Sequence, residues 1–232
     1  MLALYNEIIY RPILNLLVGL YNVIPGHDIG WVIIIITLVI RFVLAPFMHK
    51  SLKSQQAMNA LQPKLNELRE KHKDDREAQT KAMMDLYKEH QINPFSSCLP
   101  LLIQLPFLIA LYQVLAKALQ GNLAGLYSFV YNPGTLNPKF LGLIDLSHPN
   151  VVFAIIAGVV QFWQSRMMMP ASTQTDTTAK AMRFQTLYVL PIISIVIAWN
   201  LPAGLPLYWI VTTLFAVAQQ YYIIRGQDQT KL

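Results

Sequence analysis

Charged residues and cysteine are both scarce in this chain. Only 13% of its 232 residues are charged, whereas soluble domains usually carry about 25%. Because so few charges cannot cover a globular surface, and because 54% of the residues are hydrophobic, we expect lipid to be the solvent. The single cysteine, Cys98, excludes an intramolecular disulfide and a cysteine metal cluster. The sequence shows no signal peptide and no GxxxxGK[ST] phosphate loop, so we expect neither cleavage nor ATP use.

Long apolar runs are present instead. A helix needs roughly 20 apolar residues to span the hydrocarbon core of a bilayer. Five stretches meet this requirement, at residues 29–48, 99–119, 151–168, 186–201 and 202–224. They are joined by segments 49–98, 120–150 and 169–185, and residues 225–232 form a tail. The sequence therefore predicts an all-α polytopic membrane protein, a bundle of five transmembrane helices.

The distribution of basic residues predicts the orientation of the bundle. Lys and Arg concentrate on the cytoplasmic side of membrane proteins. Fourteen of them lie in segments 49–98, 166–183 and 225–232, whereas only Arg11, Lys117 and Lys139 lie on the other side. We therefore expect the N-terminus outside and the C-terminus in the cytoplasm.

Residues 1–28 have a different pattern. Glu7, Arg11, Asn15 and Asn22 fall within about 80° of arc on a helical projection, and apolar residues cover the rest. A helix with a narrow polar face lies in the membrane interface and does not cross it. This pattern predicts an amphipathic helix on the outer face, although a sixth span remains an alternative.

The segment 49–98 is predicted to form a helical hairpin in the cytoplasm. It carries two stripes at helical spacing, Leu61, Leu65 and Leu68 in the first and Met83, Leu86 and Tyr87 in the second. A polar turn at 73–75 separates them, so the two helices would pair through the stripes. The mixed charges on the outside are either a solvated face or a docking surface for a partner.

Arg41 stands inside the first predicted span. It lies eight residues before His49, about 12 Å along a helix, which is too far for its side chain to reach the interface. A mid-span arginine costs roughly 2.5–3.5 kcal/mol, and the five spans contain no Asp or Glu to pair with it. They do contain neutral polar side chains: Thr37, Gln104, Gln113, Gln161, Gln164, Trp209, Thr212, Thr213, Gln219 and Gln220. This set predicts a wet cavity around the arginine; the alternative is that Arg41 only bonds helix carbonyls.

Two other classes of function compete with this interpretation. A small-solute or ion transporter would normally show paired ionisable residues or repeated interrupted helices, and neither is found. An intramembrane enzyme would need a nucleophile beside a base, but all five histidines fall in loops or at helix ends. We therefore expect no catalytic residues, no metal and no cofactor.

Several motifs resemble the YidC/Oxa/Alb family of membrane-protein insertases. The segments 30–46, 61–64, 84–88 and 93–106 match in order, followed by 140–146, 202–209 and Gln219-Gln220. The resemblance covers about residues 5–225. It implies a five-helix bundle around a hydrophilic groove that is open to the cytoplasm and laterally to lipid. It also implies a bacterial inner-membrane protein that inserts other membrane proteins without ATP.

The resemblance also implies roles for particular residues. By the resemblance the groove would be lined by Arg41, Thr37 and Trp209, with Gln104 as a neighbour; the polar side chains of the spans add Gln161, Gln164 and Thr213. A hydrophobic slide for the incoming helix would be formed by Leu101, Leu102, Leu105, Phe107, Leu108, Leu207, Ile210 and Leu214. Implied partners are nascent membrane proteins, membrane lipids, the ribosome, the signal recognition particle receptor and the Sec translocon, without sequence-specific binding of nucleic acid. We expect a short form without a large outer domain, and the tail at 225–232 predicts weak ribosome tethering.

Overall fold

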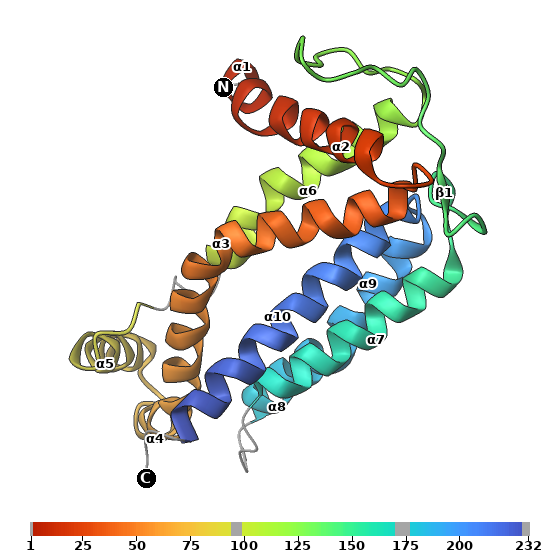
Figure 1. Ribbon diagram of the computed structural model, residues 1–232. Helices are drawn as coiled ribbons and strands as arrows, with labels where there is room; N and C mark the ends of the chain where they lie inside the picture. The colour runs from red at the N-terminus through yellow and green to blue at the C-terminus, as the bar shows by residue number, and fades with distance from the viewer. Residues whose placement is uncertain (1, 94–98, 170–176, 229–232) are drawn as a thin grey trace.

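The computed structural model describes residues 2–93, 99–169 and 177–228, which are mostly helical (Figure 1). In chain order the elements are α1 (Leu2–Tyr5), η1 (Asn6–Tyr10), α2 (Arg11–Val23), α3 (Ile29–Ala60), α4 (Gln62–Lys71), α5 (Arg76–Glu89), α6 (Leu99–Ala118), β1 (Lys139–Phe140), β2 (Ile144–Asp145), α7 (Val151–Met168), α8 (Thr177–Phe184), η3 (Gln185–Val189), α9 (Leu190–Trp199) and α10 (Gly204–Asp228). Here η denotes a π-helical turn. β1 and β2 form a small antiparallel hairpin.

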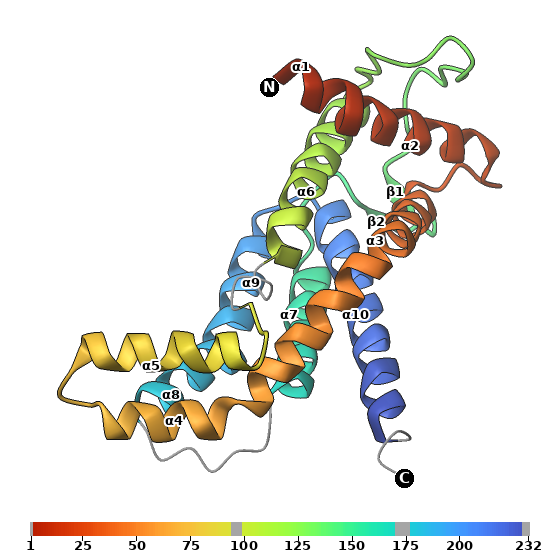
Figure 2. The ribbon, with the colours of Figure 1, turned by 90° about the vertical axis from the view of Figure 1, so that its left-hand side faces the viewer.

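The long helices run between two different ends of the molecule. The end with α2 and the β1–β2 hairpin is here called the loop end, and the end with α4 and α5 the hairpin end (Figures 1 and 2). α10 packs along both α3 and α7, and α9 packs on α7. The α7–α9 contact is close because Gly158 leaves room for Ile195, where a Cβ atom would overlap the Ile195 side chain.

Two of the described helices, α3 and α7, are long and apolar enough to cross a membrane by length and composition. Residues 102–118 and 185–199 form shorter apolar helices. The number of five spans therefore stays a prediction.

α3 does not end at the predicted limit of the first span. It continues as one helix from Ile29 to Ala60 with Pro46 inside it, and its ribbon changes direction between the two halves (Figure 1). A proline removes one backbone hydrogen bond and bends a helix without necessarily ending it. The second half of α3 therefore forms the base of the hairpin, and the Asn59 amide donates to the Met168 carbonyl of α7 at 2.8 Å.

The hairpin is formed by α4 and α5, which lie side by side (Figure 2). The Asp75 side chain caps α5 by accepting from the backbone N–H groups of Glu77 and Ala78. Leu61 and Leu65 are buried, but α5 has no buried residue, so its stripe of Met83, Leu86 and Tyr87 is only half-buried. The buried apolar contact within the hairpin therefore comes mainly from the α4 side.

α6 is packed unevenly along its length. Its second half, towards the loop end, is buried at Ala110, Leu111 and Val114, whereas Leu102 and Leu105 in its first half are exposed. α6 contacts η1 and α2 more extensively than it contacts α3 or α10. One face of α6 therefore remains uncovered towards the hairpin end.

The N-terminal segment packs against protein more than the sequence suggested. Leu14, Leu17 and Val18 of α2 are fully buried in a core that includes α3 and α6. The polar face is covered at Asn15, which is only 5% exposed and binds the loop 120–137, whereas Glu7 on the same face stays exposed. A second apolar stripe stays exposed and could still meet a membrane: Leu4, Ile8, Leu16 and Val23.

Asn15 fixes the loop 120–137 to α2. Its amide donates to the carbonyls of Arg11 (2.8 Å) and Gly125 (3.2 Å), and its carbonyl accepts from the Tyr127 N–H at 2.7 Å.

Asn15→Leu should lower the free energy of unfolding by about 1–3 kcal/mol, because buried backbone groups lose their partner. Limited proteolysis should then cut the loop faster. Asn22→Leu removes a single bond, to the Tyr131 carbonyl, and should have a smaller effect; equal cleavage rates would contradict this role of Asn15.

A buried arginine with no counter-ion: the candidate functional site

Arg41 lies in the middle of the apolar part of α3 and is buried, with 8% of its surface exposed. Thr37, one turn earlier, is fully buried. Among the residues that the structure describes, none forms a hydrogen bond or an ion pair with the Arg41 guanidinium. Because this group carries five N–H donors and a permanent charge, it needs water or an anionic group from another molecule.

Tyr208 is the neighbour of Arg41 on α10. It is 3% exposed, and it lies close enough to act electrostatically on the arginine. Its hydroxyl lies near the Thr212 hydroxyl but makes no hydrogen bond of good geometry within the described part of the chain. The sequence analysis did not select Tyr208 as a site residue. Its spacing of four residues from Thr212, on the same face of α10, is the signal that could have found it.

Five further polar atoms are buried without a hydrogen-bond partner in the described ranges. One, Asn66 Oδ1, belongs to α4 of the hairpin, and the other four belong to α6, α7 and α10: Gln104 Nε2, Gln161 Oε1, Thr212 Oγ1 and Gln220 Oε1. Leaving such an atom dry costs about 1–3 kcal/mol, so a native interior usually hydrates it. Thr212 lies one turn after Tyr208 on α10, so these two hydroxyls favour a hydrated interior on the side of α10 that meets Arg41.

The other predicted groove residues differ in the hydrogen bonds and contacts that they can make with a substrate. The hydroxyls of Thr37 and Thr213 donate to backbone carbonyls of their own helices, at 2.6 Å to Ile33 and 2.8 Å to Trp209. Their protons are therefore used, and these hydroxyls can only accept from a substrate. Gln164 and Trp209 are half-buried and remain candidates for contact.

The predicted slide residues do not form one exposed surface. Leu102, Leu105 and Leu214 are exposed, Phe107 and Leu108 are partly buried, and the Leu101 side chain lies outside the described residues. Leu207 and Ile210 are buried in the core and cannot present a surface in this conformation. Leu207, Ile210 and Leu214 share one face of α10, and neighbouring helices cover this face at Leu207 and Ile210 and again at Val217, but not at Leu214.

α9 carries an apolar surface that the sequence analysis left out. Ile192, Ile193, Val196 and Ile197 are each between 46% and 59% exposed. The helix is apolar on nearly every side, so its periodicity gives no indication of which face packs and which stays open.

Comparisons with known proteins agree with this architecture. Residues 19–230 match the model of the family described as 60Kd inner membrane protein. A protein of Geotalea daltonii named membrane protein insertase YidC is 37% identical over 215 residues, which are 92% of this chain and 36% of that protein. Proteins of the same name from Nitratidesulfovibrio vulgaris (strain DP4) and Pelobacter propionicus are 37% and 34% identical over 219 residues, covering 94% and 93% of this chain and 38% of each relative.

This chain thus spans just over a third of the length of these relatives. The family match covers most of the chain, from the second half of α2 to the end of α10. The resemblance to the YidC/Oxa/Alb family is confirmed, and this chain belongs to the 60Kd inner membrane protein family.

Proposed function

We propose that this chain is a membrane-protein insertase that receives nascent membrane proteins in a hydrophilic groove around Arg41 and releases their helices sideways into the bilayer. The observation that carries this proposal is the buried Arg41, which has no counter-ion in the described structure and lies in a helical core with unsatisfied polar atoms. The relatives named membrane protein insertase YidC support it.

In this proposal the chain lies in the bacterial inner membrane with five spans: α3, α6, α7, the continuous η3–α9 segment, and α10. The loop end faces outside and the hairpin end faces the cytoplasm. The ratio of fourteen to three basic residues supports this orientation. The N-terminal segment would lie along the outer interface, with its exposed stripe of Leu4, Ile8, Leu16 and Val23 in lipid.

The groove would lower the cost of moving a polar tail across the membrane. A polar tail in hydrocarbon loses its hydrogen bonds to water, and a hydrated interior shortens that path. Arg41 would attract acidic residues of the tail, because its charge is uncompensated. The apolar segment of the substrate then enters lipid, at about 0.8 kcal/mol for each buried CH₂ group, so no ATP is needed.

The packing of α6 supports entry and release at the hairpin end. Its first half exposes Leu102 and Leu105, and Leu214 is exposed on α10. These residues would form the slide, together with the open face of α9. Leu207 and Ile210 would join only if α6 moved away from α10.

The α4–α5 hairpin would meet nascent chains and targeting factors, because it projects from the bundle and carries charges of both signs (Figure 2). The ribosome, the signal recognition particle receptor and the Sec translocon are proposed partners. The chain would carry no catalytic residue or cofactor and would not bind nucleic acid by sequence.

Complementation tests the proposed function. Bacteria depleted of their own insertase should regain growth, and insertion of a single-span substrate, when they express this chain, with an empty vector as control. Protease access to the outer tail of the substrate measures insertion. If the chain reaches the membrane but rescues nothing, the insertase proposal fails. Solute or ion flux through proteoliposomes of the purified chain would then favour a transporter.

A further inference from the structure

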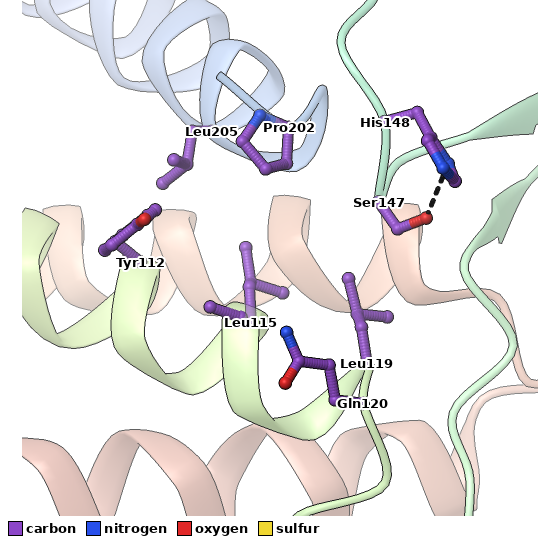
Figure 3. A pocket seen from close by; sticks show the side chains of 9 residues that line it. Tyr112, Leu115, Leu119, Gln120, Ser147, His148, Pro202 and Leu205 are labelled. Carbon is purple, nitrogen blue, oxygen red and sulfur yellow. Dashed lines mark hydrogen bonds between the residues drawn. The ribbon is translucent and has the colours of Figure 1, made fainter. Parts of the chain in front are cut away.

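A cavity of about 360 Å³ lies at the loop end, and Arg41 is not among its lining residues (Figure 3). Its wall on α6 is formed by Tyr112, Leu115, Ala116 and Leu119. Pro202 and Leu205, where α10 begins, line the opposite side. Most of the lining is thus apolar.

One end of the cavity is polar. Gln120 at the end of α6 and the pair Ser147 and His148 in the loop before α7 complete the lining (Figure 3). Ser147 Oγ lies 3.0 Å from His148 Nδ1 and donates to Asp145 Oδ1 at 2.5 Å. His148 Nδ1 also lies 3.3 Å from Asp145 Oδ2. The cavity is therefore amphipathic: most of its hydrogen-bonding groups lie at this rim, and the Tyr112 hydroxyl is a further polar group of the wall.

The apolar part of the cavity continues along the helix as an exposed stripe. Ile109 and Tyr112 are both 46% exposed and share a face with Ala116 and Leu119. From Ile109 to Leu119 is ten residues, about 15 Å along a helix. This length equals half of the roughly 30 Å hydrocarbon core, which is the depth of one leaflet.

We propose that this cavity binds one phospholipid of the leaflet at the loop end, with an acyl chain along Ile109–Leu119 and a zwitterionic, amine-bearing head group at the rim. The amphipathic lining and the one-leaflet length fit this occupant, whereas a peptide tail would leave its backbone unpaired against the apolar wall. The Gln120 amide offers donors to the phosphate. The Asp145 carboxylate, beside the rim, is the partner for the ammonium group.

The charge state of the rim agrees with such a head group. The hydrogen bond from Ser147 holds the pKa of the exposed Asp145 carboxyl below its usual value, and His148 adds to this effect. Asp145 is therefore ionised at neutral pH. None of the three rim residues carries a permanent positive charge, so the site offers no strong attraction to a purely anionic head group.

Native mass spectrometry of the purified full chain tests this inference, with phosphatidylethanolamine and phosphatidylglycerol as competing probes. The wild type should retain one lipid and prefer phosphatidylethanolamine. Ala116→Trp fills the cavity and should weaken that binding at least tenfold. Val152→Trp is the matched control, because Val152 is 63% exposed on α7 at the same end and does not line the cavity.

A second variant leaves the cavity open and changes only its rim. The variant Asp145→Asn should keep a bound lipid but lose the preference for phosphatidylethanolamine, because it removes the charge that pairs with the ammonium group. The inference is overturned if the wild type retains neither lipid, if it prefers phosphatidylglycerol, or if Ala116→Trp binds as the wild type does. The measurement needs no insertion activity, so its failure is separate from failure of the proposed function.

Discussion

Arg41→Ala is expected to abolish insertion of a single-span substrate with an acidic outer tail, whereas Arg41→Lys should keep most of it. The charge at this position has no partner in the described structure, so it is free to attract the tail, and lysine preserves the charge. Removing it should reduce insertion at least tenfold in the depletion assay, scored by protease access to the tail. A substrate with a neutral tail should lose much less.

Arg166→Ala is the matched control, because it removes the same charge from an exposed position near the end of α7. It should insert both substrates normally. If Arg41→Ala inserts the acidic substrate as well as the wild type does, the charge is not part of the mechanism, and the hydrophobic surfaces must act alone.

The thermal stability of Arg41→Ala separates the groove from simple helix packing. A buried charge without a partner destabilises the fold, so its removal should leave Tm unchanged or raise it. If Arg41 instead holds α3 to its neighbours, Tm should fall in Arg41→Ala. A fall of Tm together with normal insertion would favour this purely structural role.

Gly158→Leu is expected to produce the largest loss of stability. The side chain would overlap Ile195 at the α7–α9 contact and approach the Pro191 carbonyl. Overpacking of a filled interior costs about 1–3 kcal/mol, and a whole isobutyl group should reach the upper end of that range. The expected result is a clear fall in Tm, measured by thermal unfolding in detergent, and weaker packing of α9 on α7.

Two further variants isolate the packing effect at Gly158. Gly19→Leu introduces the same side chain into α2 at a position where a Cβ atom meets nothing within 4 Å, so its Tm should stay near that of the wild type. Adding Ile195→Ala to Gly158→Leu should restore part of the stability, since it vacates the space that the leucine needs. If both glycine variants lose the same stability, the close approach of α7 and α9 is not the cause.

The sequence by itself determined the class of this protein and its family. Apolar runs and the scarcity of charge are properties of the chain that do not depend on packing, and the motifs from α3 to α10 were sufficient for the family resemblance. Arg41 was also found this way, because a mid-span charge with no acidic residue in any predicted span is visible in the sequence.

Only the tertiary structure decided which of the predicted groove and slide residues can contact a substrate. Thr37 and Thr213 look equivalent to free hydroxyls in the sequence, but their protons are used by backbone carbonyls of the preceding turn. The spacing of Tyr208 from Thr212 marks a polar face of α10, but only the packing of α10 along α3 places Tyr208 beside Arg41. Such contacts are set by how helices distant in the chain are oriented, which local spacing does not encode.

The predicted slide residues show most clearly what spacing in the sequence cannot determine. Leu207, Ile210 and Leu214 share one face of α10, yet the first two are buried and the third is 42% exposed. Periodicity identifies a face, but it cannot say how far a neighbouring helix covers that face. Here the coverage depends on how α3, α6 and α7 pack along α10, and this is a property of tertiary packing alone.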